Sequence, residues 1–292
     1  MADLYAYYPG CSLHASAKEY DRSLKAVFAK LNIELEEPKG WVCCGASATY
    51  CIDESLAVSL PVQNLRSIEK MGLGEVVVPC AACFQRLKTA VHEMKESAET
   101  ERRVEQILGG KYGYSVAVRH PLEIVEKLVS GGAAKDMLIG NLGQMRVACY
   151  YGCMLVRPPK IMGFDQPEDP LTMDRLISAI GGSPVQWSYK VDCCGASLTL
   201  NEPDIVVKLA KDIIEDAVES GAEVIAVGCQ LCQANLDMRQ ARINAQYSTD
   251  FHIPILYFSQ LLGLTLGIGA KKLGLRKHIV DPMPVLARYG LA

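Results

Sequence analysis

Cysteine is the residue in this sequence with the greatest chemical potential. Ten of its twelve cysteines form two sets of five, each with a single cysteine, then an adjacent pair, then a Cys-x-x-Cys. The first set is Cys11, Cys43, Cys44, Cys80 and Cys83, and the second is Cys153, Cys193, Cys194, Cys229 and Cys232. Equivalent cysteines lie 142 to 150 residues apart, so the pattern indicates an internal duplication.

The residues around the cysteines repeat as well. Tyr-Tyr-Pro-Gly precedes Cys11 and Tyr-Tyr-Gly precedes Cys153, while Cys-Cys-Gly-Ala-Ser occurs unchanged at both adjacent pairs. Shared context at equivalent positions supports two copies of one cysteine motif.

Five thiols in one set favour an iron–sulfur cluster. A zinc ion takes four ligands and would leave one thiol over. A redox dithiol needs only the Cys-x-x-Cys and would leave three cysteines unexplained. Iron and sulfide bind thiolates strongly, and a cluster can use several of them. Zinc and a redox dithiol remain as alternatives to the cluster.

Composition restricts the class of protein. The net charge is −3 and 22% of the residues are charged, with no basic run, so a nucleic-acid partner is not expected. The first residues contain no secretory signal. The apolar stretch 253–270 is interrupted by Pro254 and several glycines, so we expect a buried helix there and a cytoplasmic protein. Cytosolic thiols stay reduced, which again favours metal or redox chemistry over disulfides.

Alternating strand and helix patterns explain how the cysteines could meet. Strands are expected at 4–8, 33–36, 75–78, 146–151, 184–188 and 223–227. Helices are expected at 17–31, 54–71, 84–95, 171–180, 203–219 and 233–243, with Pro61 kinking or restarting the second. The order predicts an α/β fold of two pseudo-repeated, Rossmann-like halves, each a small parallel sheet flanked by helices. Sites in such folds form at the carboxyl ends of strands, where the cysteines lie.

The same patterns suggest four segments. Residues 1–98 form the first cysteine-rich domain and 99–145 a helical linker. Residues 146–250 form the second cysteine-rich domain and 251–292 a C-terminal helical extension.

A few further residues are candidates for chemistry or packing. His14 follows Cys11 by three residues and is a candidate proton donor, although a satisfied structural or surface histidine is the default interpretation. Cys51 and Cys149 are expected to be small buried residues. Arg86, Lys88, Arg157 and Lys160 could attract an anion, but solvated surface charge is the default expectation for them.

The complete motif resembles the cysteine-rich "CCG" domain, and two copies resemble the B-type subunit of heterodisulfide reductase and its bacterial relatives. The gaps on either side of the adjacent pair are 31 and 35 residues in the first copy, and 39 and 34 in the second. Residues 257–264 and 278–282 also look like the end of that subunit.

The resemblance implies two noncubane 4Fe–4S clusters, one held by the five cysteines of each set, with a disulfide reduced or formed between them. It also implies two partners: a ferredoxin-like subunit with two cubane clusters and a flavin subunit. The substrate could be a small disulfide or sulfur on a lipoyl carrier protein. The alternative is an electron-transfer iron–sulfur subunit of another respiratory or sulfur-oxidising oxidoreductase, with no disulfide substrate of its own.

Overall fold

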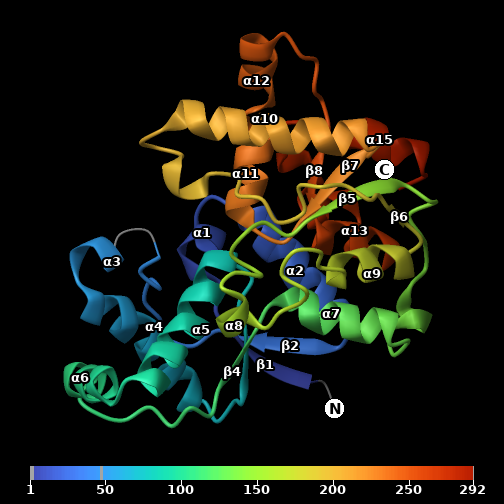
Figure 1. Ribbon diagram of the computed structural model, residues 1–292. Helices are drawn as coiled ribbons and strands as arrows, with labels where there is room; N and C mark the ends of the chain where they lie inside the picture. The colour runs from blue at the N-terminus through green and yellow to red at the C-terminus, as the bar shows by residue number, and fades with distance from the viewer. Residues whose placement is uncertain (1–2, 47–48, 292) are drawn as a thin grey trace.

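Two four-stranded parallel sheets form the centre of the computed structural model, which describes residues 3–46 and 49–291 (Figure 1). The first sheet has the order β2-β1-β3-β4 and the second the order β6-β5-β7-β8. The first comprises β1 (Asp3–Tyr7), β2 (Ile33–Glu36), β3 (Glu75–Val77) and β4 (Ala117–Arg119). The second comprises β5 (Arg146–Tyr150), β6 (Ser183–Pro184), β7 (Val224–Val227) and β8 (Ile255–Tyr257). The expected α/β fold of two repeated halves is confirmed.

The helices of the first half follow its strands in alternation. They are α1 (Gly10–His14), α2 (Lys18–Lys30), α3 (Thr49–Ile52), α4 (Glu54–Glu69), α5 (Ala81–Glu96), α6 (Ala98–Leu108), α7 (Pro121–Ser130) and the 3-10 turn η1 (Lys135–Met137). Helix α4 begins at its N-cap, Asp53, whose carboxylate accepts from two backbone amides. It continues through Pro61, so the expected restart of the helix there is wrong.

The second half repeats this alternation with small differences. Its helices are α8 (Pro159–Met162), α9 (Thr172–Ala179), α10 (Pro203–Glu219), α11 (Gln230–Met238), α12 (Gln240–Tyr247), α13 (Phe258–Thr265), α14 (Ala270–Leu273) and α15 (Met283–Arg288), with 3-10 turns η2 (Ala196–Leu198) and η3 (Leu275–Lys277). The helix expected at 233–243 is therefore two helices, the first starting directly after Cys229. Strand β6 is shorter than expected.

The outer strands β4 and β8 come from segments expected to be helical. Strand β4 lies within 99–145 and pairs with β3, and β8 lies within 251–292 and pairs with β7. Each leads into a helix with a capping box, built by His120 and Glu123 in α7 and by Tyr257 and Gln260 in α13. Each repeat therefore includes one more strand and one more helix than its cysteine motif.

The two halves share one continuous core. Helix α7 of the first half packs on α9 of the second, and α13 of the second packs on α2 of the first (Figure 1). Tyr20 of α2 and Tyr257 stack with ring centroids 4.1 Å apart. The contacts are reciprocal, so each half completes its hydrophobic packing with a helix of the other.

Candidate metal centres

The first cysteine set gathers at the carboxyl ends of neighbouring strands. Cys11 follows β1, the adjacent pair Cys43 and Cys44 follows β2, and Cys80 and Cys83 follow β3. The Sγ atoms of Cys44 and Cys83 are 3.1 Å apart, and the amide of Cys83 donates to Cys80 Sγ over 3.4 Å. Cys11 and Cys43 are exposed and the other three thiols are buried. The set therefore reaches from the core to the surface.

The second set converges in the same way. One cavity is lined by all of its thiols, namely Cys153, Cys193, Cys194, Cys229 and Cys232. Its Cys194 and Cys232 Sγ atoms are 3.5 Å apart, the counterpart of the short contact in the first set. Among the described residues, no three Cys, His, Asp or Glu side chains surround one point as ligands of a single metal ion, and the thiols touch in pairs.

Glycine is required immediately before the first cysteine of each set. Gly10 has φ +71° and Gly152 has φ +67°, a region that favours glycine. A Cβ on Gly10 would lie 2.9 Å from Cys83 Sγ, and one on Gly152 would lie 3.0 Å from Cys232 Sγ. The backbone thus approaches the last thiol of each set too closely for a side chain.

Two buried tyrosines, which the cysteine motifs do not single out, hold the adjacent pairs. The Tyr8 hydroxyl donates to Val42 O over 2.7 Å, and the Tyr150 hydroxyl donates to Asp192 O over 2.6 Å. Val42 and Asp192 each directly precede an adjacent pair, so the tyrosines tie the first strand of each half to the pair. The repeated Tyr-Tyr in the sequence is the available signal for this role.

Hydrogen bonds between thiols lower the pKa of the accepting thiol and raise the pKa of the donating one. The pKa of Cys44 is lowered to about 3 because the thiols of Cys43 and Cys83 donate to it. The pKa of Cys193 is lowered to about 6, chiefly by the thiol of Cys153. The donating thiols have raised pKa values, and these are Cys43, Cys83, Cys153 and Cys232. Each set therefore contains a thiol ready to deprotonate, which is the form that binds metals.

Each Cys-x-x-Cys also begins a helix. Cys80 is the N-cap of α5 and Cys229 is the N-cap of α11. At Cys80 the free amides at the start of the helix stabilise a thiolate, since its Sγ accepts from the amide of Cys83.

Arg86 is buried beside the first set, so the surface charge expected for it is wrong. Its guanidinium donates to Ala57 O over 2.8 Å and lies 4.0 Å from the centre of the Tyr50 ring. Its positive charge helps to lower the pKa of Cys44. Arg157, by contrast, is partly exposed and pairs with Glu168 at 2.9 Å.

The two Cys-x-x-Cys segments meet at the junction of the halves. His120 Nε2 lies 3.2 Å from Pro79 O and 3.1 Å from Gly228 O, the carbonyls directly before Cys80 and Cys229. Burial lowers the pKa of His120 to about 4, so the ring is neutral at pH 7. Its Nδ1 accepts from the amide of Leu122, so the proton is on Nε2 and faces both carbonyls. One histidine therefore links the two sites.

The remaining candidates have different surroundings. His14 is exposed at the end of α1, where Nε2 lies 3.1 Å from Glu37 Oε1 and the ring meets Trp41 edge-on. Cys149 is buried in β5 as expected, but Cys51 is exposed, so the expectation of burial there is wrong. Cys51 lies in the short helix α3 at the surface.

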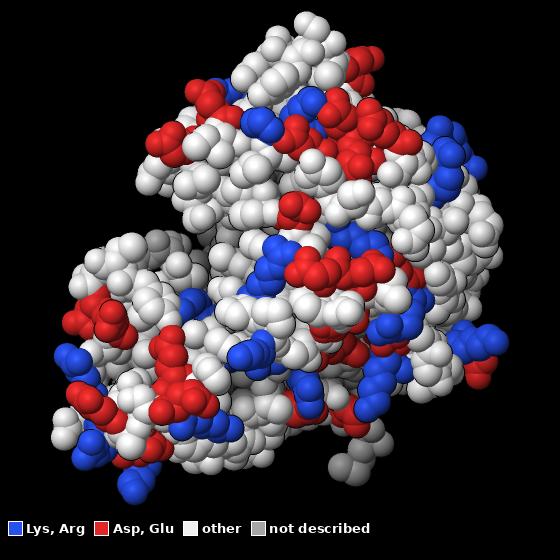
Figure 2. Space-filling model, viewed as in Figure 1, with Lys and Arg blue, Asp and Glu red and all other residues white. Residues whose placement is uncertain are grey.

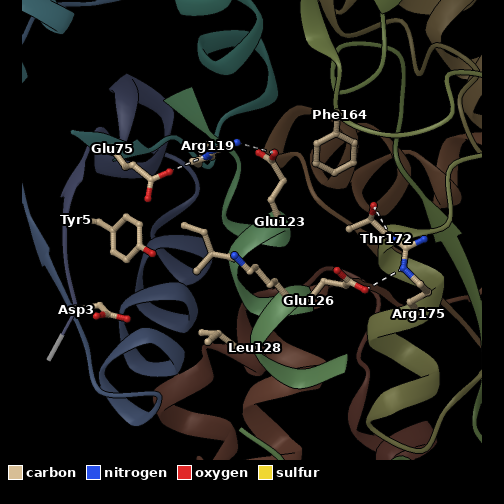
Figure 3. Close-up of a pocket in the computed structure, with 12 residues that line it drawn as sticks. Asp3, Tyr5, Glu75, Arg119, Glu123, Glu126, Leu128, Phe164, Thr172 and Arg175 are labelled. Carbon is tan, nitrogen blue, oxygen red and sulfur yellow. Dashed lines mark hydrogen bonds and ion pairs between the residues drawn. The ribbon is translucent and has the colours of Figure 1, made fainter. Parts of the chain in front are cut away.

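The surface has a cleft and a separate charged pocket. Figure 2 shows the surface hollowed between the lobe that carries α3 and the one that carries η2, which follow the two adjacent cysteine pairs. A pocket of about 520 Å³ has no cysteine in its lining, and Figure 3 shows the side chains that line it. Its arginines are paired, Arg119 with Glu75 at 2.8 Å and Arg175 with Glu126 at 2.9 Å. Its charges largely neutralise one another.

No helix among the described residues is long and apolar enough to cross a membrane. The apolar stretch 253–270 contains the buried helix α13, as expected.

Comparison with known proteins shows relatives that are similar along nearly the whole chain. The chain is 31% identical to the 8-methylmenaquinol:fumarate reductase membrane anchor subunit of Wolinella succinogenes, over 96% of this chain and 98% of that protein. It is 27% identical to the B-type subunit of the ferredoxin/F420H2-dependent CoB-CoM heterodisulfide reductase of Methanosarcina acetivorans, over 99% of this chain and 97% of that one.

A solved structure supports the fold alone. A hypothetical protein from Helicobacter pylori superposes with a TM-score of 0.76 at 12% identity, and the match covers 96% of this chain and 52% of that one. The present chain thus spans about half the length of that protein.

A family model described as "Cysteine-rich domain" (CCG) matches twice, at residues 5–88 and 147–237. Each match contains one complete set of five cysteines. The chain therefore belongs to the CCG cysteine-rich domain family and carries the domain in duplicate.

Proposed function

We propose that the chain is the iron–sulfur catalytic subunit of a heterodisulfide reductase-like complex, which reduces or forms a disulfide. The observation that carries this proposal is the convergence of five thiols in each half, with the two sets joined through His120. Relatives named as subunits of heterodisulfide reductases, similar over nearly the whole chain, support it.

The residues present fit an iron–sulfur cluster in each half. Every donor is a cysteine sulfur, the ligand type that iron–sulfur clusters use. The thiols come from separate strand ends, and glycines leave room beside them. We propose that the first set holds one noncubane 4Fe–4S cluster and the second set holds another.

The reaction needs two electrons and two protons for each disulfide. They break one S–S bond and yield two thiols, and the electrons come from a partner with ferredoxin-like clusters. Bound clusters would supply one electron each. The chain's own contribution is to position the sites at fixed spacing through His120 and to keep Cys11, Cys43 and Cys193 exposed, where a disulfide can reach them.

His14 is our proposed proton donor for the departing thiolate. It is exposed near Cys11, and Glu37 orients its ring at 3.1 Å. Replacing His14 with Gln should slow disulfide turnover by roughly a hundredfold without loss of iron, since general acids contribute this much. Unchanged turnover would remove His14 from the mechanism.

The proposed partners follow from the same resemblance. They are a subunit with two cubane clusters and a flavin subunit, and the proposed location is the cytoplasm. Co-purification of the tagged chain from its own organism under anaerobic conditions would identify them.

Iron analysis of anaerobically purified protein tests the proposal. We expect about eight iron atoms per chain, about eight acid-labile sulfides and turnover of a disulfide with an artificial reductant. Stoichiometric zinc without iron in reconstituted protein would overturn it.

A second candidate is an electron-transfer subunit with no disulfide substrate. The observation in its favour is the 31% identity to the subunit from Wolinella succinogenes, whose name describes a quinol:fumarate reductase. A dithiol or disulfide added to the isolated holoprotein decides between them. A changed electron paramagnetic resonance signal supports the disulfide reaction, and an unchanged signal supports electron transfer alone.

A further inference from the structure

The two Cys-x-x-Cys segments differ at both inner positions, and at the first of them only the second site carries a hydrogen-bonding side chain. Gln230 follows Cys229, and its repeat equivalent after Cys80 is Ala81. The Gln230 side chain crosses the junction and its Nε2 lies 2.9 Å from Cys80 Sγ of the other half. Ala81 also crosses, since it lines the cavity of the second set, but it has no donor to offer.

The orientation of the Gln230 amide follows from the acceptor. A metal-bound thiolate accepts hydrogen bonds and cannot donate, so the nitrogen must face the sulfur. Gln230 is 3% exposed, and its Oε1 has no hydrogen-bond partner within the described part of the chain. The contact with Cys80 is therefore the polar contact that holds this amide.

A second difference between the halves also favours negative charge at the first set. Arg86 and Asn235 are repeat equivalents, six residues after Cys80 and Cys229, and both are buried. Arg86 lies three residues after Cys83 on α5, so its buried guanidinium places a positive charge beside the first set. Asn235 is neutral and donates to Cys194 O at 3.0 Å, with its nitrogen 3.8 Å from Cys194 Sγ.

Other groups near the thiols do not reverse this difference. Backbone amides donate to thiols of both sets, such as that of Cys83 to Cys80 at 3.4 Å and that of Gly195 to Cys193 at 3.3 Å. Asp192, which directly precedes Cys193, adds a negative charge beside the second set.

From these contacts we infer that the two clusters are electrochemically unequal, with the first having the higher reduction potential because Gln230 and Arg86 stabilise its reduced form. Reduction adds negative charge to a cluster, and hydrogen bonds to its sulfurs or a nearby cation favour that state. The inference rests on the proposed function, because it requires a cluster in each half. An electron entering the chain would then settle first on the cluster of Cys11, Cys43, Cys44, Cys80 and Cys83.

A redox titration of the reconstituted holoprotein, followed by electron paramagnetic resonance, tests this inference. Two separate midpoint potentials are expected. Cys43→Ser and Cys193→Ser each remove one cluster and so assign the potentials to the two halves. The higher potential should disappear in Cys43→Ser.

Gln230→Met tests the hydrogen bond because methionine matches glutamine in size but has no N–H. The equilibrium for one-electron reduction of the first cluster should become less favourable by about tenfold, which corresponds to about 59 mV. The second potential should stay in place. Gln240→Met is the matched control, since Gln240 is also buried but bonds only to Leu236 O and to the backbone of Ile253.

Arg86→Gln tests the charge, and Arg86→Lys should restore most of the potential because it keeps that charge. Iron content and far-ultraviolet circular dichroism show whether each variant is folded and loaded. Equal potentials in the natural protein, or a Gln230→Met shift no larger than that of Gln240→Met, would overturn the inference. A protein without clusters would instead overturn the proposed function.

Discussion

At the scale of single residues, the hydroxyls of Tyr8 and Tyr150 serve the same purpose in the two halves. Each donates to the carbonyl directly before an adjacent cysteine pair. A tyrosine repeated before a cysteine could be noticed in the sequence. Its partner could not, because the two lie 34 residues apart in the first half and 42 in the second.

Tyr8→Phe and Tyr150→Phe should each lower the free energy of unfolding by about 0.5–1.5 kcal/mol, the net contribution of one hydrogen bond. The Tyr8 change should lie at the lower end, because Val42 O also accepts from Asn64 Nδ2 at 2.9 Å. Both changes should also speed the loss of iron to a chelator. Tyr112→Phe is the control, because the buried Tyr112 hydroxyl has no partner among the described residues. Chemical denaturation and iron release measure both effects, and equal behaviour of all three variants would contradict the assigned role.

Gly10 offers a sharper test of the space around the thiols. Gly10→Ala places a Cβ 2.9 Å from Cys83 Sγ at a positive φ, so the first cluster should fail to assemble and the iron content should fall by about half. Gly40→Ala has the same backbone strain at φ +72° with nothing within 4 Å, and should keep its iron. Full iron in Gly10→Ala would show that the loop moves aside.

At the scale of elements, the strands and helices within the cysteine motifs are predicted well and the outer strands are not. The limits of β2 and α10 match the expected ranges. Strands β4 and β8 have three residues each and escape prediction, because so short a segment has no period to distinguish strand from helix and no cysteine marks its end. Their place in the sheets depends on pairing with β3 and β7, which is a tertiary effect.

The start of α7 carries a prediction on pH, because His120 caps it. The folded protein holds the pKa of His120 near 4, below its ordinary value of 6.5, so the unfolded chain takes up the proton first. The stabilisation that neutral His120 gives the folded protein is complete above about pH 6.5. It is lost as the pH falls toward 4. The loss should be about 3 kcal/mol.

Denaturation of the natural protein and of His120→Gln at several pH values checks this. The difference between their free energies of unfolding should shrink as the pH falls from 6.5 to 4, because glutamine does not titrate. A difference that stays constant would mean that His120 is protonated, or accessible to water, in the folded state.

At the scale of the whole molecule, ten candidate cysteine ligands can be chosen from spacing alone, but their shared junction cannot. His120 and Gln230 lie 110 residues apart in the printed sequence. His120 belongs to no recognisable motif, and Gln230 stands at an inner position of Cys-x-x-Cys that the motif leaves open. Their role depends on how the halves pack, which no local pattern specifies.

If the disulfide is split between two sites, the halves are not redundant. Cys43→Ser and Cys193→Ser should each keep roughly half of the iron, because the motifs are separate. Each should lose most disulfide turnover, well beyond twofold, because groups that act as a unit are not additive. Turnover with the natural partner and with an artificial reductant measures this. If one variant kept nearly full activity in both assays, the two-site mechanism would fail and the altered half would serve only as an electron relay.

The reciprocal packing of α7 on α9 and of α13 on α2 has a consequence for ancestry. When element i of one copy meets element j of the other, and j meets i, the interface is isologous and closes as a twofold dimer. A chain with a single copy could therefore have built the same molecule as a homodimer. Its two sites would have been identical by symmetry. Fusion of the copies into one gene freed each position to change alone, and only then could glutamine and alanine stand at equivalent places.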